Sequence, residues 1–282
     1  MGPDNIGGRT RAMLIDKDNP DLLWAGSTTG GLFRSTNGGN SWVHVSLDWP
    51  TQIIGSLVQD GDGVLYAGSG SNFNENLYSV SSGDLPGQGI FRSTDNGSTW
   101  TQLQETVPDF MTPNDGWSYV NRMGVSKSKN SNGVYTLYAA TGNGLWVSED
   151  RGDTWNQPFT NLGGFPFQGT IEDVVVLNDD RVIVSYNNSI YYSSSGADSG
   201  SYVPASTQPV YPLNSLNRMS IRECPLDNNI VYAFASSSTG GNSGQAGPFV
   251  FRSDDRGENW FQFQPLPPSD IIDPNFTTNF IC

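Results

Sequence analysis

An eight-residue motif of the form Ser-x-Asp-x-Gly-x-Thr-Trp recurs along this chain and constrains its fold more than any other feature. The motif occurs four times, at residues 35–42, 93–100, 148–155 and 253–260. Each copy follows a short apolar run, as a hairpin turn follows a strand. The sequence therefore predicts repeated units in which this motif forms the turn between two antiparallel strands.

The residue types of the motif fit a tight turn. An Asp or Asn at the third position accepts hydrogen bonds from N–H groups of its own loop, and the Gly at the fifth position allows a positive φ. The Trp is expected to turn its ring into the core, where an indole removes ~150–250 Å² from water. We assign a structural rather than a catalytic role to the sixteen motif residues: Ser35, Asn37, Gly39, Trp42, Ser93, Asp95, Gly97, Trp100, Ser148, Asp150, Gly152, Trp155, Ser253, Asp255, Gly257 and Trp260.

The spacing of the motifs sets the repeat length. Their tryptophans are 58, 55 and 105 residues apart, and the last interval is two repeats long. A degraded motif at 193–198, with Tyr202 in place of the Trp, fills that interval. The sequence predicts five four-stranded units, at about 9–46, 52–104, 119–158, 169–204 and 216–264. Residues 265–282 are expected to begin a further unit, so that 1–282 is one domain or the N-terminal part of one.

On these motifs the chain resembles the Asp-box (BNR) repeat β-propellers. That family includes sialidases, xyloglucan-cleaving endoglucanases, sortilin-type receptors, a photosystem II assembly factor and many secreted bacterial surface proteins. The resemblance implies an all-β propeller of four-stranded antiparallel blades, five of them complete. Because rings of six to eight blades are common, we expect the remaining blades of a larger ring, or a partner chain, to cover the open edge.

The first residues carry a second resemblance. Residues 2–12, followed by Ile15-Asp16 and Asn19-Pro20, are similar to the start of the mature propeller in large secreted bacterial proteins that end in a C-terminal sorting domain. This implies a secreted, extracellular or cell-surface protein.

Composition excludes several classes of partner. The net charge is −14 with a pI near 4.2, and the fourteen basic residues include three lysines. This balance argues against nucleic acid and against anionic membranes. No apolar run approaches the ~20 residues of a membrane span, so membrane insertion is not expected. Cys224 and Cys282 are expected to lie at equivalent places in adjacent blades, too far apart for a disulfide, and so to be free thiols.

Loop length is the main indication of function. The long loops, at 69–88, 104–118, 156–168, 203–216 and 235–247, all belong to one face of the predicted propeller. They carry aromatic residues beside carboxylates, which suits a glycan or protein ligand. The alternative is that each aromatic ring only fixes its loop to the blades. The leading pair is Trp117, to stack on a ligand, with Asp115 to orient it; the other candidates are Phe73, Tyr78, Phe165, Phe167 and Tyr211.

The sialidase-like members of the family hold a carboxylate with three arginines on inner strands. Arg11, Arg122 and Arg218 start predicted inner strands here and are candidate binding residues. The Arg-Ile-Pro segment and the Tyr–Glu nucleophile pair of that group are absent. The alternative is that these arginines neutralise neighbouring carboxylates.

The xyloglucanase-like members carry a catalytic Asp in an Asp-Val-Gly-Gly segment. The corresponding stretch here is 27–31, and Thr28 stands where the carboxylate is expected. A hydrolase that uses two carboxylates requires both, so we assign no catalytic residue. The expected function is a binding module that uses its long-loop face. The alternative is a glycoside hydrolase whose carboxylates lie partly outside this segment.

Metal and cofactor chemistry has little support. A single histidine, His44, excludes His-rich metal sites and Ser-His-Asp triads. The turns at 16–19 and 60–62 offer clustered oxygens that suit calcium, although tight-turn chemistry explains them equally well. No cofactor and no other metal site are expected.

Overall fold

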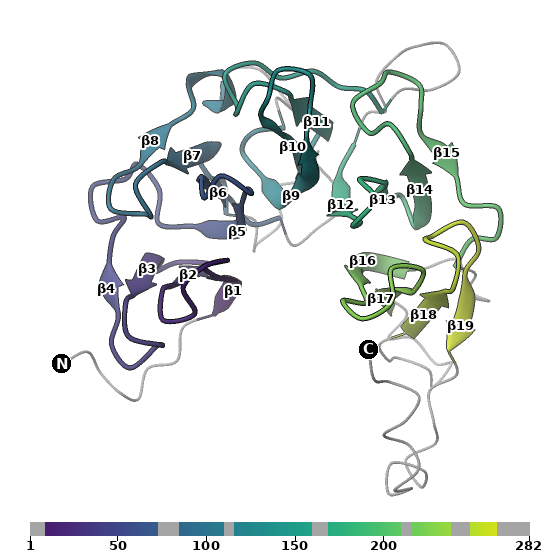
Figure 1. The fold of residues 1–282 in the computed structure, drawn as a ribbon, viewed down its shortest axis with the longest axis horizontal. Helices are drawn as coiled ribbons and strands as arrows, with labels where there is room; N and C mark the ends of the chain where they lie inside the picture. The colour runs from purple at the N-terminus through teal and green to yellow at the C-terminus, as the bar shows by residue number, and fades with distance from the viewer. Residues whose placement is uncertain are drawn as a thin grey trace, which may run out of the picture.

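The structure, a computed structural model, describes residues 9–72, 85–109, 116–159, 169–209, 216–237 and 249–263. These residues form five antiparallel sheets, each made of consecutive strands in chain order. Figure 1 shows the sheets as blades around a common centre, with the first strand of each blade innermost and an open side between the first and fifth blades. The predicted β-propeller architecture is confirmed.

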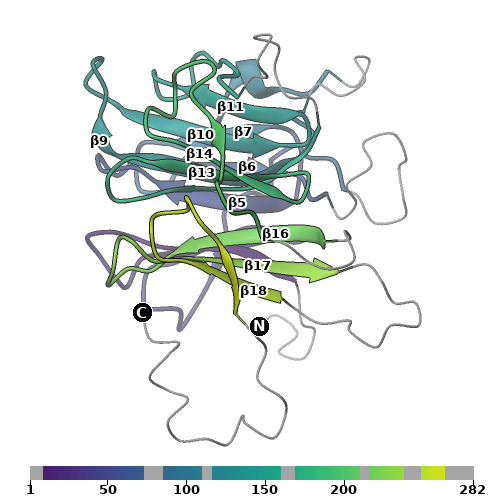
Figure 2. The same cartoon turned by 90° about the vertical axis from the view of Figure 1, so that its right-hand side faces the viewer.

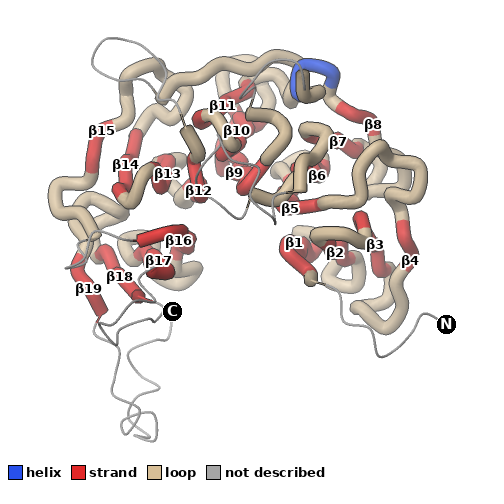
Figure 3. Tube along the Cα trace, turned by 180° about the vertical axis from the view of Figure 1, so that it is seen from behind, coloured by secondary structure: helices blue, strands red, loops and turns tan. Residues whose placement is uncertain are grey.

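The first two blades have four strands each. Blade 1 contains β1 (Thr10–Ile15), β2 (Leu23–Ser27), β3 (Gly31–Ser35) and β4 (Val43–His44). Blade 2 contains β5 (Ile54–Gln59), β6 (Leu65–Ser69), β7 (Ile90–Ser93) and β8 (Thr101–Gln102), followed by the short 3-10 turn η1 (Gln104–Thr106). Figure 3 shows that turn in blue beside β8.

Blade 3 contains β9 (Val120–Lys129), β10 (Tyr135–Thr141) and β11 (Gly144–Ser148), and an isolated bridge between Val147 and Asn156 stands in place of a fourth strand. Blade 4 contains β12 (Ile171–Val176), β13 (Val182–Tyr186), β14 (Ser189–Ser193) and β15 (Val203–Pro204). Blade 5 contains β16 (Leu216–Glu223), β17 (Val231–Ser237), β18 (Phe249–Ser253) and β19 (Phe261–Phe263).

The core lies between neighbouring blades rather than inside any one of them. The second strand β6 is buried along its whole length. Because both of its faces are covered, it consists of apolar or small residues. One cluster joins Trp24 and Leu32 of blade 1 to Ile54 and Phe91 of blade 2. Similar clusters join blades 2 and 3, 3 and 4, and 4 and 5. Each blade is therefore stabilised mainly by its neighbours.

The Asp-box hairpins are closed by the hydrogen bonds that their residue types favour. Asp95 accepts from the N–H of Thr99 at 2.8 Å and from its hydroxyl at 2.6 Å. The N–H of Gly97 donates to Ser93 Oγ at 2.9 Å, and Trp100 Nε1 donates to the carbonyl of Gly97 at 3.2 Å. The degraded box of blade 4 keeps this last bond, because the Tyr202 hydroxyl donates to the carbonyl of Gly196 at 2.8 Å.

The four box tryptophans are not equally buried, which differs from the expectation. The indoles of blades 2, 3 and 5 pack toward the preceding blade: Trp260 is 2% exposed, Trp100 is half-buried against the cluster between blades 1 and 2, and Trp155 against that between blades 2 and 3. No described blade precedes the first, and Trp42 is 36% exposed. The burial of a box indole is thus set by the adjacent blade and not by its own hairpin.

The connections collect on two opposite faces, as the edge-on view in Figure 2 shows. On the long-loop face the described ends of the loops bond to one another, for example Gly87 N–H to the carbonyl of Ser118 at 2.7 Å. On the other face, the box face, ion pairs link turns of neighbouring blades. Arg151 contacts Asp62 at 2.8 Å, and Arg256 contacts Asp179 at 2.7 Å.

Candidate functional site

The inner strands of blades 3, 4 and 5 bring two arginines onto one carboxylate. Arg122 Nε on β9 lies 3.1 Å from Asp173 Oδ1, and Arg222 Nη1 on β16 lies 2.9 Å from Asp173 Oδ2. Asp173 lies on β12, between them in chain order and in the ring. Three strands that are distant in the sequence therefore form one charged cluster on the inner strands of blades 3 to 5.

Asp173 is held by more than the two arginines. Its carboxylate also accepts hydrogen bonds from the Ser220 hydroxyl at 2.8 Å, the Ile221 N–H at 3.0 Å and the Val174 N–H at 2.9 Å. The side chain is 3% exposed, and this burial raises the pKa of Asp173, while the charge of Arg122 opposes that rise. A carboxylate so fully engaged positions the guanidinium groups and has no free lone pair for a substrate.

The arginines keep donors for a further acceptor. Arg122 uses Nε for Asp173, and Arg222 uses Nη1 for Asp173 and for the carbonyl of Ile221. Their side chains remain 30% and 46% exposed. Within the described part of the chain, two positive charges thus share one negative charge, which leaves the cluster cationic in a chain of net charge −14.

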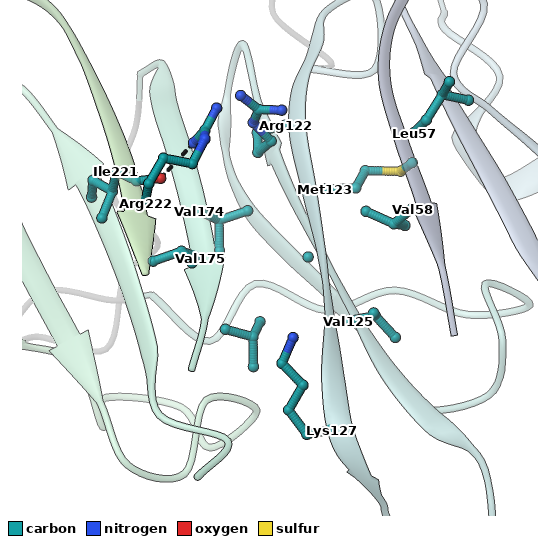
Figure 4. Close-up of a pocket in the computed structure, with 12 residues that line it drawn as sticks. Leu57, Val58, Arg122, Met123, Val125, Lys127, Val174, Val175, Ile221 and Arg222 are labelled. Carbon is teal, nitrogen blue, oxygen red and sulfur yellow. Dashed lines mark hydrogen bonds between the residues drawn. The ribbon is translucent and has the colours of Figure 1, made fainter. Parts of the chain in front are cut away.

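A cavity of about 240 Å³ adjoins this cluster. Figure 4 shows Arg122 and Arg222 at one end of it and Lys127 at the other, with aliphatic side chains between them. Arg122 comes near the start of β9, on the long-loop side, and Lys127 near the end of that strand. The apolar wall of the cavity comes from Leu57, Val58, Val125, Val174, Val175 and Val176. Cationic groups above an apolar wall suit a ligand that has both an anionic group and an apolar surface.

The three predicted arginines have different positions. Arg122 belongs to the cluster. Arg11 donates Nη1 to Ser71 Oγ at 2.9 Å, at the root of a long loop in blade 2. Arg218 lies at an irregularity in the β16–β17 register, and its side chain is outside what the structure describes.

Trp117 does not lie where the sequence analysis expected it. Its side chain is 6% exposed, and its ring centroid lies 5.1 Å from those of both Trp146 and Trp155. The indole therefore packs in the core between blades 2 and 3 and does not present a face for stacking. Because its neighbours include a box Trp, the ring fixes the loop root to the blade, which is the alternative role considered for these aromatics.

The other loop candidates fall outside the described residues: Asp115, Phe73, Tyr78, Phe165, Phe167 and Tyr211.

Asp173, Arg222 and Lys127 were missed by sequence reasoning. The sequence did contain a signal for Asp173, because Glu172 and Asp173 interrupt an otherwise apolar inner strand. Arg222 lies four residues after Arg218, so it shares a face of an ideal strand with that candidate. What the sequence did not show is that strands of three blades converge on the same carboxylate.

Thr28 is buried at the position where a xyloglucanase-like carboxylate was sought. It is 5% exposed, its N–H donates to the carbonyl of Arg9 at 3.0 Å, and its hydroxyl lies 3.4 Å from the same oxygen. The side chain therefore closes the edge of blade 1 and does not face an open cleft.

In the two turns considered for calcium, Asp16 and Asp60 accept hydrogen bonds from N–H groups of their own turns. Asp16 accepts from the N–H groups of Asp18 and Asn19 at 2.9 and 2.8 Å, and Asp60 accepts from those of Asp62 and Val64. No cluster of three or more candidate metal ligands occurs within residues 9–72, 85–109, 116–159, 169–209, 216–237 and 249–263.

The expectation that Cys224 is a free thiol is wrong. Its side chain is 1% exposed and is disulfide-bonded. The sequence contains one other cysteine, Cys282, which lies beyond the described residues.

Comparison with known families identifies the repeat. Residues 145–157, which include most of β11 and the whole third box, match the BNR-Asp box repeat. The chain is a β-propeller, and its third box matches the BNR-Asp box repeat. The propeller is 25% identical to xyloglucanase Xgh74A of Acetivibrio thermocellus over 93% of its own length and 32% of that enzyme. It is 30% identical to a xyloglucanase of a Paenibacillus species over 58% of its length and 15% of that enzyme. The propeller thus spans about a third or less of these relatives.

Solved structures show the same fold at lower identity. The GH74 enzyme of Niastella koreensis superposes with a TM-score of 0.60 and 17% identity, over 90% of the propeller and 38% of that chain. YCF48 bound to a D1 peptide superposes with a TM-score of 0.54 and 16% identity, over 93% of the propeller and 68% of that chain. The extracellular domain of a putative one-component system from B. thetaiotaomicron superposes with a TM-score of 0.61 and 16% identity, over 93% of the propeller and 29% of that chain. In the described part of the propeller no helix is long and apolar enough to cross a membrane.

Proposed function

We propose that this propeller is a glycan-binding module that takes a carboxylate-bearing sugar along the inner strands of blades 3 to 5, on the side of the long-loop face. The observation that carries this proposal is the cavity beside Arg122 and Arg222, where two guanidinium groups share one buried carboxylate. A guanidinium with free donors binds a carboxylate in a planar, charge-assisted geometry. The valines beside it suit the apolar face of a sugar ring.

The contacts that orient the two arginines are present without a ligand. Asp173 fixes both arginines through short contacts and is itself fixed by Ser220 and Ile221. Ordering a free arginine on binding costs conformational entropy, so a guanidinium that is already held loses less. This preorganisation favours a recognition role for the cluster beyond its contribution to blade packing.

The relatives support a carbohydrate ligand, and another neighbour shows that the fold accommodates other partners. The curated relatives are named xyloglucanases, whereas YCF48 was solved with a peptide. We propose a sugar on the strength of the sequence relatives, since the likeness to YCF48 concerns the fold.

Isothermal titration calorimetry with oligogalacturonate, and with a neutral xyloglucan oligosaccharide for comparison, tests the proposal. Arg222→Gln is expected to weaken binding of the acidic sugar on the order of 10- to 100-fold, the equivalent of one charged hydrogen bond. Arg256→Gln, on the box face, is the matched control and leaves binding unchanged. Equal binding of the neutral sugar, or an effect of Arg256→Gln as large as that of Arg222→Gln, contradicts the proposal.

Xyloglucan hydrolysis is the second candidate, because xyloglucanases align with 93% of the propeller. Buried Thr28, which is bonded to the carbonyl of Arg9, speaks against it. A reducing-end assay on xyloglucan decides between the two: we expect no product from residues 1–282, and measurable product would favour the hydrolase.

We also propose a secreted or cell-surface location, which the opening residues suggest. The similarity to the fold of an extracellular domain from B. thetaiotaomicron is consistent with it. Cell fractionation with an antibody against the propeller tests the location.

A further inference from the structure

The three lysines of this chain differ in what their ammonium groups contact. Lys17 pairs with Asp18 at 2.6 Å, and Lys129 pairs with Asp62 at 2.8 Å. Lys127 is exposed and lines the cavity described above, and its ammonium group forms no ion pair with any residue that the structure describes. In a chain of net charge −14, a lysine that faces a cavity without a carboxylate partner favours an anionic ligand there.

Lys127 lies on a side of β9 that regular alternation would not give it. Successive side chains of a strand point to opposite faces. Met123 and Val125 pack in the cluster between blades 2 and 3. Arg122 instead contacts Asp173 of blade 4. By this alternation Lys127 would face blade 2 with Val125, but Figure 4 shows its side chain on the same side of β9 as Arg122.

A bulge in β9 accounts for this difference. Residues 126–128 of β9 lie opposite the single residue Thr136 of β10, and such extra residues interrupt the alternation of side chains. The N–H of Thr136 donates to Ser126 Oγ at 2.9 Å, and that hydroxyl donates to the carbonyl of Ser128 at 2.7 Å. Local hydrogen bonds therefore fix the backbone on both sides of Lys127.

The bulge is also held from blade 4. Asp180, in the turn between β12 and β13, accepts hydrogen bonds from the N–H groups of Lys127 and Ser128 and from the hydroxyl of Ser128. The backbone of Asp180 has a φ of 64°, a left-handed conformation that Asp adopts more readily than most residues. Because these three donors occupy its carboxylate, Asp180 orients the backbone of Lys127 and leaves the ammonium group available to a ligand.

The surface between the two cationic ends of the cavity is apolar. Gly124 is the residue of β9 between Arg122 and Lys127 on this side, and a methyl group there would lie 2.9 Å from Val176 Cγ2. The regular part of β9 from Arg122 to Val125 alone covers roughly 10 Å at ~3.3 Å per residue. The two cationic ends are therefore separated by more than one sugar ring.

We propose that Lys127 forms a second anionic subsite, which makes the ligand an acidic oligosaccharide rather than a single acidic sugar. This inference rests on the proposed function, because it places the first carboxylate at Arg122 and Arg222. A second carboxylate, on a later sugar of the same chain, pairs with Lys127, and the rings between them lie along Gly124 and Val176. A ligand with one carboxylate reaches only one end, so the affinity of this site increases with the length of the acidic chain.

Isothermal titration calorimetry of the 282-residue chain against galacturonate and oligogalacturonates of two to six units tests the second subsite, with competition titrations for the weakest ligands. We expect Lys127→Gln to weaken binding of the longest oligomers by about three- to tenfold, since an exposed ion pair contributes less than a buried one. Binding of galacturonate is unchanged in this variant. Arg222→Gln, in contrast, weakens binding at every length.

Lys129→Gln is the matched control, because it removes the same charge from the same strand, at a lysine that already pairs with Asp62. It leaves binding unchanged at every length. Lys127→Arg keeps the charge and so keeps the preference for long oligomers. Asp180→Gly removes the acceptor that holds the bulge but allows the positive φ, and it lowers the affinity for long oligomers only.

Failure of the second subsite is distinguishable from failure of the proposed function. If no oligogalacturonate binds, or if binding does not depend on Arg222, the proposed function is wrong and the second subsite with it. If the acidic sugars bind through Arg222 but Lys127→Gln has no effect, or weakens galacturonate as much as the long oligomers, only the second subsite is wrong. Thermal melts followed by circular dichroism establish that every variant folds.

Discussion

Arg222 donates Nη1 to Asp173 Oδ2 at 2.9 Å across the junction of blades 4 and 5, although the two residues are 49 positions apart in the sequence. Arg122 reaches the other oxygen of the same carboxylate from blade 3. The cluster thus links the inner strands of blades 3, 4 and 5. Its consequences for stability and for binding can be separated by substitution.

Asp173→Asn is expected to destabilise the propeller by about 1–3 kcal/mol, because the buried group keeps its place but loses the charge that two arginines pair with. Binding of an acidic sugar should weaken as well, since both guanidinium groups lose their restraint. Chemical denaturation and calorimetry measure the two effects. Ser220→Ala, which removes one neutral hydrogen bond to the same carboxylate, should produce smaller losses of both.

Acid should weaken the box hairpins. The hydrogen bonds from the side chain and the N–H of Thr99 lower the pKa of Asp95 from 3.8 to about 2. A group whose pKa is lower in the folded state contributes stability above its unfolded pKa, and loses it as the pH falls toward the folded value. Stability should therefore decline between about pH 4 and pH 2, and Asp95→Asn should be less stable at neutral pH with a shallower decline. Denaturation midpoints across this range measure the effect; equal slopes for both proteins would contradict it.

Trp117→Ala should cost about 3–5 kcal/mol, because the ring is buried between two other indoles. Trp42→Ala should cost much less, since solvent already reaches more than a third of that side chain. Equilibrium unfolding at low concentration compares the two variants. Similar losses would contradict the packing described here.

Gly97→Ala should destabilise the propeller more than Gly39→Ala. Both glycines have positive φ, 73° and 86°, so both variants bear the strain of a left-handed residue. Only at Gly97 does the added methyl group also overlap the preceding blade, at Trp24, which adds about 1–3 kcal/mol of overpacking. Equilibrium unfolding makes the comparison; equal losses would show that Gly97 does not pack closely on the preceding blade.

The sequence alone determined the repeat and its turns. The hairpin bonds of Asp95 to Thr99 and of Gly97 to Ser93 depend on residues within four positions of each other, so local composition specifies them. Strand order followed too, because each blade pairs consecutive strands through short connections. Even the degraded box was recognisable, with Tyr202 in place of the tryptophan.

Tertiary structure decided what each repeat contacts. Trp42 and Trp260 occupy the same motif position, yet one is 36% exposed and the other 2%, because a blade precedes only the second among those described. Trp117 was predicted on the surface but lies in the core, since Trp146 and Trp155 from the next blade cover it. Asp173 joins Arg122 and Arg222 for the same reason. Contacts between repeats depend on the angle at which blades are arranged around the ring, and no local pattern of residues encodes that angle.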